Sequence, residues 1–492
     1  MGKREHSQIA MSTQKFIRDV GIIGITQVLS NLGAFFLLPI ITKTLGTYDY
    51  GTWAQISITV SLLSPLALLG LQMAFVRFLA AEKDAARIRE VFFSIFFFVF
   101  FTGMLVSVLV FALSDFLAVT VFSDIATSYY IKAGSFLILL SVLDQISLFY
   151  FRISRRIHIF GLLSLFQTFG RLFLILALLL VGFGLLGVIG ATLVVQSCIV
   201  ILSLILIIRQ IGFAIPKFEG FGELIKYGAP LTPNSLIRWI TDSSDRYIIG
   251  IFLGLSAVGI YSASYAIGSL VHLFIAPIQF ILFPELSRLY DEERVGDVKN
   301  YLSSSLRYFL LIAIPAVTGL TVLAKPFLMI LTTPAFVIGS IIIPFIALSG
   351  LLGGVFQIVI NITHLVKKTQ FNLFIHILAA VSNLVLNIVL IPFIGILGAA
   401  IATLASYALM VIVGICISFR DLSFDPGYGF ILKCVVASGI MAAILLVFNP
   451  NNILYLLCTV GIGIIIYFFL MVIMKGLGRK EFNLVKGMII KL

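Results

Sequence analysis

The sequence predicts an all-α integral membrane protein, and three observations lead to this fold class. The 492 residues are 61% hydrophobic and only 11% charged, whereas soluble domains carry about 25% charged residues. Apolar stretches of about 20 residues, the length needed to cross a bilayer as a helix, recur along the whole chain. Finally, the second part of the chain repeats the pattern of the first, as membrane transporters often do.

Fourteen apolar segments are long enough to be transmembrane helices. The first is not expected to be a cleaved signal peptide, because its apolar stretch is too long and no cleavage site with small residues follows it. The predicted segments are 16–44, 50–76, 91–113, 131–151, 159–181, 185–208, 224–252, 257–284, 305–324, 335–361, 371–392, 396–418, 430–448 and 453–474.

The positive charges indicate the orientation of these segments. Of the 33 Lys and Arg residues, 27 fall at the two termini and in alternate loops, and only Lys43, Lys132 and Lys325 lie in the opposite loops. Basic loops face the cytoplasm, so we expect a multi-pass protein of the cell membrane with both termini cytoplasmic. The net charge of +12 is therefore a topology signal. No soluble basic face is expected that could bind nucleic acid.

A short motif at the junction of two predicted segments, which we call the corner, occurs twice. The stretch LGTYDYGTW at 45–53 shares its skeleton with LGLSAVGIY at 253–261, and GLLGVIGATL at 184–193 matches GILGAAIATL at 395–404. We therefore expect two parallel six-helix lobes, related by an axis along the membrane normal, with two further helices. The predicted domains are 1–220, 221–420, and 421–492 with its basic cytoplasmic tail.

These residues resemble a known family. LLPIITKTLGTYDYGTW at 37–53, DSSDRYIIGIFLGLSAVGIYSASYAI at 242–267 and GLLGVIGATL are similar to the polysaccharide-transporter branch of the multidrug/oligosaccharidyl-lipid/polysaccharide exporter superfamily. The resemblance covers nearly the whole chain. It implies a flippase of the O-antigen or teichoic-acid export type, with two lobes around a cavity. Such a protein moves a polyprenyl-linked oligosaccharide for surface polysaccharide biosynthesis by alternating access, and it is not an enzyme.

Polar residues within the apolar segments form stripes that repeat every three or four residues, which places them on one helix face. The repeat also predicts that the DSSDR run at 242–246 is helical, because it aligns with apolar residues of the first segment. Polar residues within membrane-spanning helices usually face a protein interior or an aqueous cavity. The candidates for the substrate path are Gln27, Asn31, Asp144, Arg171, Asn234, Arg238, Asp242, Asp245, Arg246, Gln357, Asn361, His364, Asn372, His376, Asn383 and Asn387.

The chemistry of these stripes suits a lipid-linked oligosaccharide. Arg171, Arg238 and Arg246 can bind phosphate through a planar fork, while Asn, Gln and His can bind sugar hydroxyls. The alternative for the amides is hydrogen bonding between helices. Asp144 and Arg171 could likewise form a structural pair. Along the segment-seven stripe, Arg238 with Asp242, and Asp242 with Arg246, have the spacing of helical ion pairs.

No cofactor or metal is expected, and no Walker A motif is present. A Na⁺ or H⁺ gradient could drive transport through acidic or imidazole groups, for which Asp144, Asp242, Asp245, His364 and His376 are candidates. The expected partners are the lipid-linked oligosaccharide, membrane lipid, and glycosyltransferases or a polymerase of the same pathway. The protein is expected to be a monomer.

Three other functions remain open. An ion-coupled multidrug antiporter of the same superfamily would share the fold, although the first segment holds no acidic residue at mid-helix. A peptidoglycan-precursor flippase would place arginines within segments one, two and eight, whereas Arg18, Arg77 and Arg288 lie only at their edges. A membrane glycosyltransferase would need an acidic site on a large external loop, and the longest offers only Asp115 and Asp124.

Overall fold

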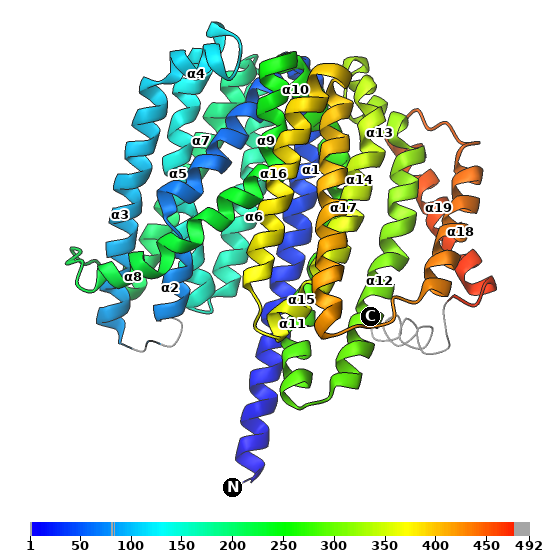
Figure 1. Ribbon diagram of the computed structural model, residues 1–492. Helices are drawn as coiled ribbons and strands as arrows, with labels where there is room; N and C mark the ends of the chain where they lie inside the picture. Colours follow the sequence, from blue (N-terminus) through cyan, green and yellow to red (C-terminus); the bar gives the residue numbers. More distant parts are fainter. Residues whose placement is uncertain (1, 80–81, 83, 477–492) are drawn as a thin grey trace. The chain divides into compact units, whose positions relative to one another are not determined.

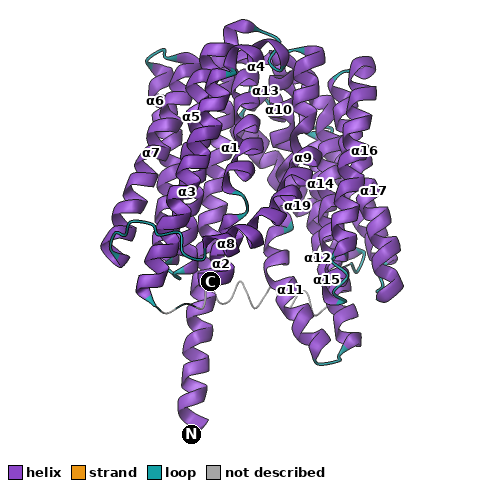
Figure 2. Ribbon diagram, turned by 60° about the vertical axis from the view of Figure 1, so that its left-hand side comes forward, coloured by secondary structure: helices purple, strands orange, loops and turns teal. Residues whose placement is uncertain are grey.

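The computed structural model describes residues 2–79, 82 and 84–476, in which helices joined by short loops make up the fold (Figure 1). No strand occurs within these ranges (Figure 2). In a bilayer the backbone must satisfy its own hydrogen bonds, which a helix achieves within one segment. The prediction of an all-α membrane protein is confirmed. The basic tail from Lys480 onward lies outside the described residues.

The contacts between residues divide the chain into two units. The first contains Met1–Trp239 and Leu253–Gly259, and the second contains Ile240–Phe252 and Ile260–Leu492. Helices up to α8 belong to the first unit: α1 (Gly2–Leu68), α2 (Leu71–Leu79), α3 (Ala85–Ala112), α4 (Ser114–Thr120), η1 (Ile125–Thr127), α5 (Ser128–Ile153), α6 (Ile157–Leu180), α7 (Gly184–Ile211) and α8 (Phe221–Gly228), followed by the turn η2 (Ala229–Leu231).

Two helices contribute residues to both units, namely α9 (Thr232–Leu253) and α10 (Leu255–Gly268). The remaining elements belong to the second unit. They are η3 (Ser269–Phe274), α11 (Ala276–Asp291), α12 (Val295–Val322), α13 (Ala324–Leu331), η4 (Pro334–Ile342), α14 (Ile343–Val359), α15 (Asn361–Leu365), α16 (Gln370–Ile394), α17 (Ile396–Asp421), α18 (Tyr428–Leu445) and α19 (Ile453–Ile473).

Twelve stretches of the described chain are long and apolar enough to cross a membrane, against fourteen predicted segments. Two local features account for the difference. The first two segments fall within the continuous stretch Gly21–Leu68, which includes a non-helical residue at Gly46. Helix α9 carries the charged DSSDR run and is not among the twelve. The structure therefore establishes a multi-pass membrane protein with twelve candidate spans.

The core of the first unit consists of apolar side chains from several helices. Phe92, Phe93 and Phe96 of α3 form a cluster with Tyr150 and Phe151 of α5, and the rings of Phe92 and Tyr150 meet edge to face at 5.2 Å. Since lipid is as apolar as these side chains, close packing rather than escape from water holds such helices together. Edge-to-face aromatic pairs contribute to that packing.

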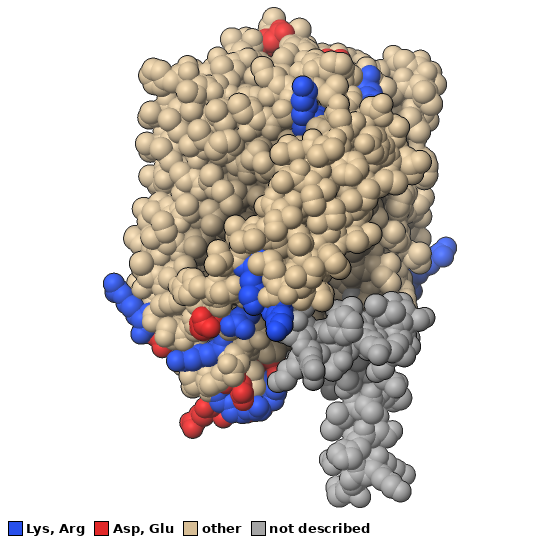
Figure 3. Space-filling view, turned by 90° about the vertical axis from the view of Figure 1, so that its right-hand side faces the viewer, with Lys and Arg blue, Asp and Glu red and all other residues tan. Residues whose placement is uncertain are grey.

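Two clusters of buried apolar side chains hold the helices of the second unit together. Phe356 of α14 packs with Ile375 and Ala379 of α16 and Met410 of α17. At the other side, α18 and α19 lie beside α12 (Figure 1) and bury Leu311 with Cys434, Met441 and Tyr467. Figure 3 shows a face on which most charged side chains gather at the lower edge, while the wall above is largely uncharged. Such a wall suits contact with lipid.

Candidate functional site

The DSSDR run forms part of helix α9, which confirms the prediction that it is helical. Its residues occupy the second half of the helix, where Ser244, Asp245 and Arg246 are buried and Asp242 is half-buried. Polar side chains at such a position must find partners, because an unpaired charge in an apolar interior is costly. The neighbouring helices of the second unit provide these partners.

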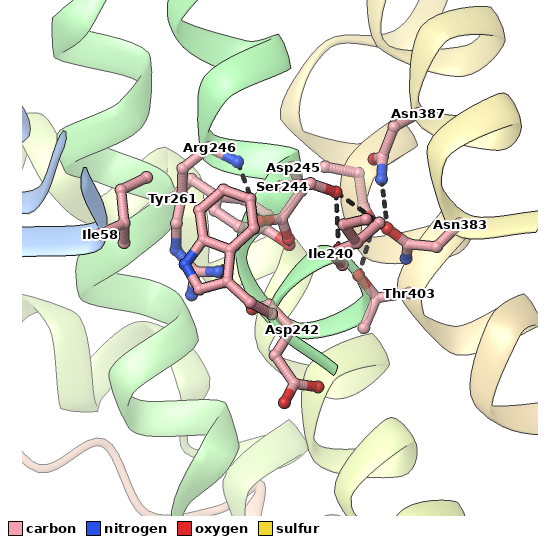
Figure 4. Close-up of polar contacts among 12 residues, drawn as sticks. Ile58, Ile240, Asp242, Ser244, Asp245, Arg246, Tyr261, Asn383, Asn387 and Thr403 are labelled. Atoms are coloured by element: carbon pink, nitrogen blue, oxygen red, sulfur yellow. Dashed lines mark hydrogen bonds and ion pairs between the residues drawn. The ribbon is translucent and has the colours of Figure 1, made fainter. Parts of the chain in front are cut away.

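Asp245 and Arg246 form a buried ion pair within the second unit (Figure 4). One guanidinium nitrogen, Nη1 of Arg246, lies 2.9 Å from Oδ1 of Asp245 and donates a second hydrogen bond of 2.7 Å to the backbone carbonyl of Asp242. The side chains of Asp245 and Arg246 are only 2% and 8% exposed. Pairing and full hydrogen bonding are the conditions under which buried charges are tolerated.

Two tyrosines of α10 complete this pair. The hydroxyl of Tyr261 donates to the other carboxylate oxygen of Asp245. The guanidinium carbon of Arg246 lies 4.0 Å from the ring centroid of Tyr265 and 5.4 Å from that of Tyr261, which are distances for cation–π attraction. We name these four residues, Asp245, Arg246, Tyr261 and Tyr265, the charge cluster.

The i,i+4 spacing suggested a different pairing, with Asp242 as the partner of Arg246. In the structure Arg246 reaches the backbone of Asp242, and its ionic partner is the adjacent Asp245. The carboxylate of Asp242 instead accepts a hydrogen bond of 2.8 Å from Tyr407 of α17. The imidazole of His272 lies beyond Tyr407, with ring centroids 5.9 Å apart. Asp242 therefore lies at one end of a polar row through the second unit.

Neutral polar groups of α9 and α16 form a second cluster, also shown in Figure 4. The hydroxyl of Ser244 donates to the carbonyl of Ile240 at 2.6 Å and lies 3.5 Å from Oδ1 of Asn383. Asn387 donates to the same oxygen of Asn383 at 2.8 Å. Both asparagines are fully buried. Ser244, which was not among the predicted candidates, thus brings α9 next to the predicted stripe of segment eleven.

The predicted stripe on segment ten makes local contacts. The backbone carbonyl of Gln357 accepts hydrogen bonds from Asn361 at 2.7 Å and from Gln279 of α11 at 2.8 Å. At the junction of α15 and α16, the side chains of His364 and Asn372 meet at 3.2 Å. His376 packs against the ring of Phe356. These contacts join helices and do not involve α9.

The first unit holds a smaller polar group between α5 and α6. Gln167 donates a hydrogen bond of 2.5 Å to the buried carboxylate of Asp144. Arg171 lies one helical turn beyond Gln167, and its Nε has no hydrogen-bond partner among the described residues. In the first half of α1, Gln27 donates to Asn31 at 3.0 Å on an exposed surface. Arg171 and Asp144 therefore share one region without a direct ion pair.

Arg238 and Asn234 differ from the other candidates on α9. Both belong to the first unit, lie in the first half of the helix and are exposed. No ion pair of Arg238 is found within the described part of the chain. Since Arg246 is already neutralised by Asp245, Arg238 is the α9 arginine available for an anionic ligand.

The sequence-based candidates omitted Tyr261, Tyr265 and Tyr407, whose side chains hold the α9 carboxylates and guanidinium in place. Tyr261 closes the repeated corner at 253–261, so the repeat provided one signal for it. Tyr265 follows one helical turn later on the same face. Tyr407 lies in an apolar run and is recognisable only from the tertiary contact.

A family model described as a polysaccharide biosynthesis protein matches residues 40–338, more than half of the chain. The chain belongs to this family. The match includes both copies of the repeated corner, all of α9 and the charge cluster. Its range ends before the helices α14, α16 and α17, which provide Gln357, Asn383 and Tyr407.

Two relatives of this family member come from Haloferax volcanii. This chain is 27% identical over 256 residues to a "Probable low-salt glycan biosynthesis flippase Agl15". The aligned region covers 51% of this chain and 54% of the relative. This chain is also 28% identical over 203 residues to a "Probable flippase AglR". That aligned region covers 41% of this chain and 43% of the relative. The chain thus spans about half the length of the curated relatives that it matches.

Solved structures show the same fold. The lipid II flippase MurJ in an inward closed conformation has a TM-score of 0.77, with 92% of this chain and 98% of that chain covered at 18% identity. An inward-facing multidrug resistance transporter of the MATE family, in the MOP superfamily, has a TM-score of 0.69, with 82% and 97% covered at 13% identity. At these identities the likeness establishes a MOP-type fold.

Proposed function

We propose that the protein is a flippase that moves a polyprenyl-linked oligosaccharide across the cell membrane by alternating access, for the biosynthesis of surface polysaccharide. The observation that carries this proposal is membership of the polysaccharide biosynthesis family, together with the two archaeal relatives that are named as flippases. Flipping breaks no covalent bond, so the protein acts as a transporter and not as an enzyme.

The polar groups within the helices support a cargo with phosphates and sugars. Arg238 is an exposed cation on α9, and a guanidinium binds phosphate through two parallel hydrogen bonds. Arg171 provides a second cation in the first unit. Among the other candidates, the Asn, Gln and His side chains provide amides and imidazoles for hydroxyl groups. In this proposal the charge cluster does not bind the cargo. It stabilises the conformation of α9 next to the substrate path.

The proposed architecture has fourteen spans, arranged as two parallel six-helix lobes at 1–220 and 221–420 with two helices at 421–492. Gly46 divides α1 into the first two spans, and α9 is the seventh. Both termini face the cytoplasm, because most of the basic residues lie in the same set of loops. The protein acts as a monomer next to glycosyltransferases or a polymerase of its pathway.

The test is a deletion strain that is complemented with the intact gene. Without the protein, we expect the lipid-linked oligosaccharide to accumulate on the inner leaflet and surface glycan to decrease. The two leaflets are distinguished by an impermeant sugar-modifying enzyme applied to intact cells and then to lysed cells. A strain with normal surface glycan, no redundant flippase and new sensitivity to cationic drugs would instead establish the antiporter alternative.

A further inference from the structure

Four helices of the first unit meet around a cavity of about 500 Å³. Its lining comes from the last turns of α2, α5 and α7 and from the first turn of α3. In Figure 1 this is the lower end of α2 and α3. The loops at this end carry basic residues that we expect to face the cytoplasm. A volume of this size is typical of ligand-binding pockets.

Buried apolar side chains and exposed arginines share the lining of this cavity. Phe75 and Leu79 of α2 are buried, whereas Arg155 and Arg156, in the turn after α5, are exposed. Within the described part of the chain, neither arginine forms an ion pair. A molecule that suits this lining has an anionic group next to an apolar one.

The carboxylate of Glu82 also lines the cavity, but it already has partners. Its Oε1 accepts a hydrogen bond of 3.0 Å from the backbone N–H of Asp84, and its Oε2 lies 3.6 Å from Nε of Arg87. Glu82 therefore does not neutralise Arg155 or Arg156, and the lining keeps an excess of positive charge.

Tyr150 of α5 is the second observation that indicates a ligand. Its side chain lines the cavity and is only 2% exposed, and its ring packs edge to face against Phe92. The hydroxyl of Tyr150 forms no hydrogen bond with any residue that the structure describes. Since buried hydroxyl groups are usually hydrogen-bonded, the missing partner is an atom that occupies the cavity.

The repeat provides a second copy of the turn that carries the arginines. The backbone N–H of Arg156 donates to the carbonyl five residues earlier at 2.8 Å, and that of Lys368 in the second unit does the same at 2.8 Å. The preceding residues, Arg155 and Lys367, have φ +55° and +60°. Both turns thus end a helix with a left-handed residue and place two basic side chains after it.

The two turns differ in how their charges are compensated. In the second unit, Nζ of Lys368 lies 2.5 Å from Oδ1 of Asp421 at the end of α17. The shift of 211 positions that aligns 184–193 with 395–404 also aligns Gln210 with Asp421. Gln210 lines the cavity of the first unit and is neutral. The turn of the first unit therefore lacks the acidic partner that its repeat copy has.

We propose that this cavity binds the headgroup of an anionic phospholipid from the adjacent leaflet. Arg155 and Arg156 hold the phosphate through charge-assisted hydrogen bonds. The hydroxyl of Tyr150 and the amide of Gln210 bind hydroxyl groups of the same headgroup. Basic pockets between helix ends on the cytoplasmic side suit such lipids, and the apolar lining from Phe75 and Leu79 accommodates the start of the acyl chains.

The test titrates the delipidated full-length protein in detergent with dioleoyl phosphatidylglycerol and counts bound lipid by native mass spectrometry. The double variant Arg155→Gln with Arg156→Gln should weaken the first binding step about tenfold or more, because two charge-assisted contacts are lost. The matched control is Lys367→Gln with Lys368→Gln, which removes the same charge from the repeat copy of the turn and should leave binding unchanged. Equal binding by the two double variants would overturn the site.

Tyr150→Phe tests the buried hydroxyl while it keeps the ring in place. Because this hydroxyl has no hydrogen-bond partner in the described protein, Tm without lipid should be unchanged. The rise in Tm caused by saturating phosphatidylglycerol should be smaller in the variant, since a ligand stabilises according to its affinity. An equal rise in wild type and variant would contradict the proposal, and this comparison decides if the arginine variant does not fold.

Three further probes distinguish the possible sources of a phosphate. Dioleoyl phosphatidylcholine has no net negative charge, inorganic phosphate has no apolar part, and undecaprenyl phosphate, which represents a polyprenyl carrier, has no headgroup hydroxyls. Each should compete less well than phosphatidylglycerol itself. Equal or stronger competition by any of them would assign the cavity to that chemistry and overturn the phospholipid. The site does not depend on transport, so its failure leaves the proposed flippase function intact.

Discussion

The hydroxyl of Tyr407 on α17 donates a hydrogen bond of 2.8 Å to the carboxylate of Asp242 on α9, which precedes it by 165 positions. This contact links α9 to α17 within the second unit. The hydroxyl of Tyr407 therefore helps to satisfy the half-buried carboxylate of Asp242.

Tyr407→Phe should therefore destabilise the protein by about 1–3 kcal/mol, because the half-buried carboxylate of Asp242 loses one hydrogen bond to a charged group. The measurement is the thermal unfolding of purified protein in detergent. Tyr308→Phe is the matched control, since Tyr308 is 42% exposed and its hydroxyl can bind water. Equal Tm values for the two variants would show that Asp242 does not depend on Tyr407.

The charge cluster predicts a strongly non-additive pair of substitutions. Arg246→Met leaves the buried carboxylate of Asp245 unpaired, and Asp245→Asn leaves the guanidinium unpaired, so each alone should cost about 3–5 kcal/mol. The double variant removes both charges and should recover a large part of that loss. A double-mutant cycle on Tm and protein yield measures the coupling. Additive losses would show that the two charges do not stabilise each other.

Arg238 should affect transport and not folding, because its side chain is exposed and the proposed cargo is anionic. Arg238→Ala should reduce surface glycan about tenfold or more at normal protein level, through loss of a charge-assisted contact. Arg238→Lys should restore only part of this, because it keeps the charge but lacks the planar fork. Ile240→Val serves as the control on the same helix. Similar glycan output from all three variants would remove Arg238 from the transport path.

The proposed orientation is testable at two exposed positions. Ser123→Cys lies before η1, and Glu293→Cys lies between α11 and α12. An impermeant thiol reagent on intact cells should label position 123 and leave position 293 unlabelled until the cells are lysed. The opposite pattern would invert the topology, and labelling at both positions would mean that the alternation of basic loops does not report orientation in this chain.

Much of the fold could be predicted from composition and from the repeat. Hydropathy alone would have placed 242–246 in a loop, and the alignment with the first segment correctly assigned it to α9. Helical spacing also placed Asp242 and Arg246 on one face. It did not identify their partners, because Tyr261, Tyr265 and Tyr407 come from other helices, and spacing along one helix carries no information on tertiary neighbours. The close approach of Gly51 to the backbone of Leu255 likewise required coordinates.

The adjacency of Asp245 and Arg246 also matters while the chain is being synthesised. An isolated arginine at the centre of a nascent helix costs about 2.5–3.5 kcal/mol on insertion through the translocon. The two opposite charges leave the ribosome one after the other, so α9 can enter the bilayer with this pair already neutralised.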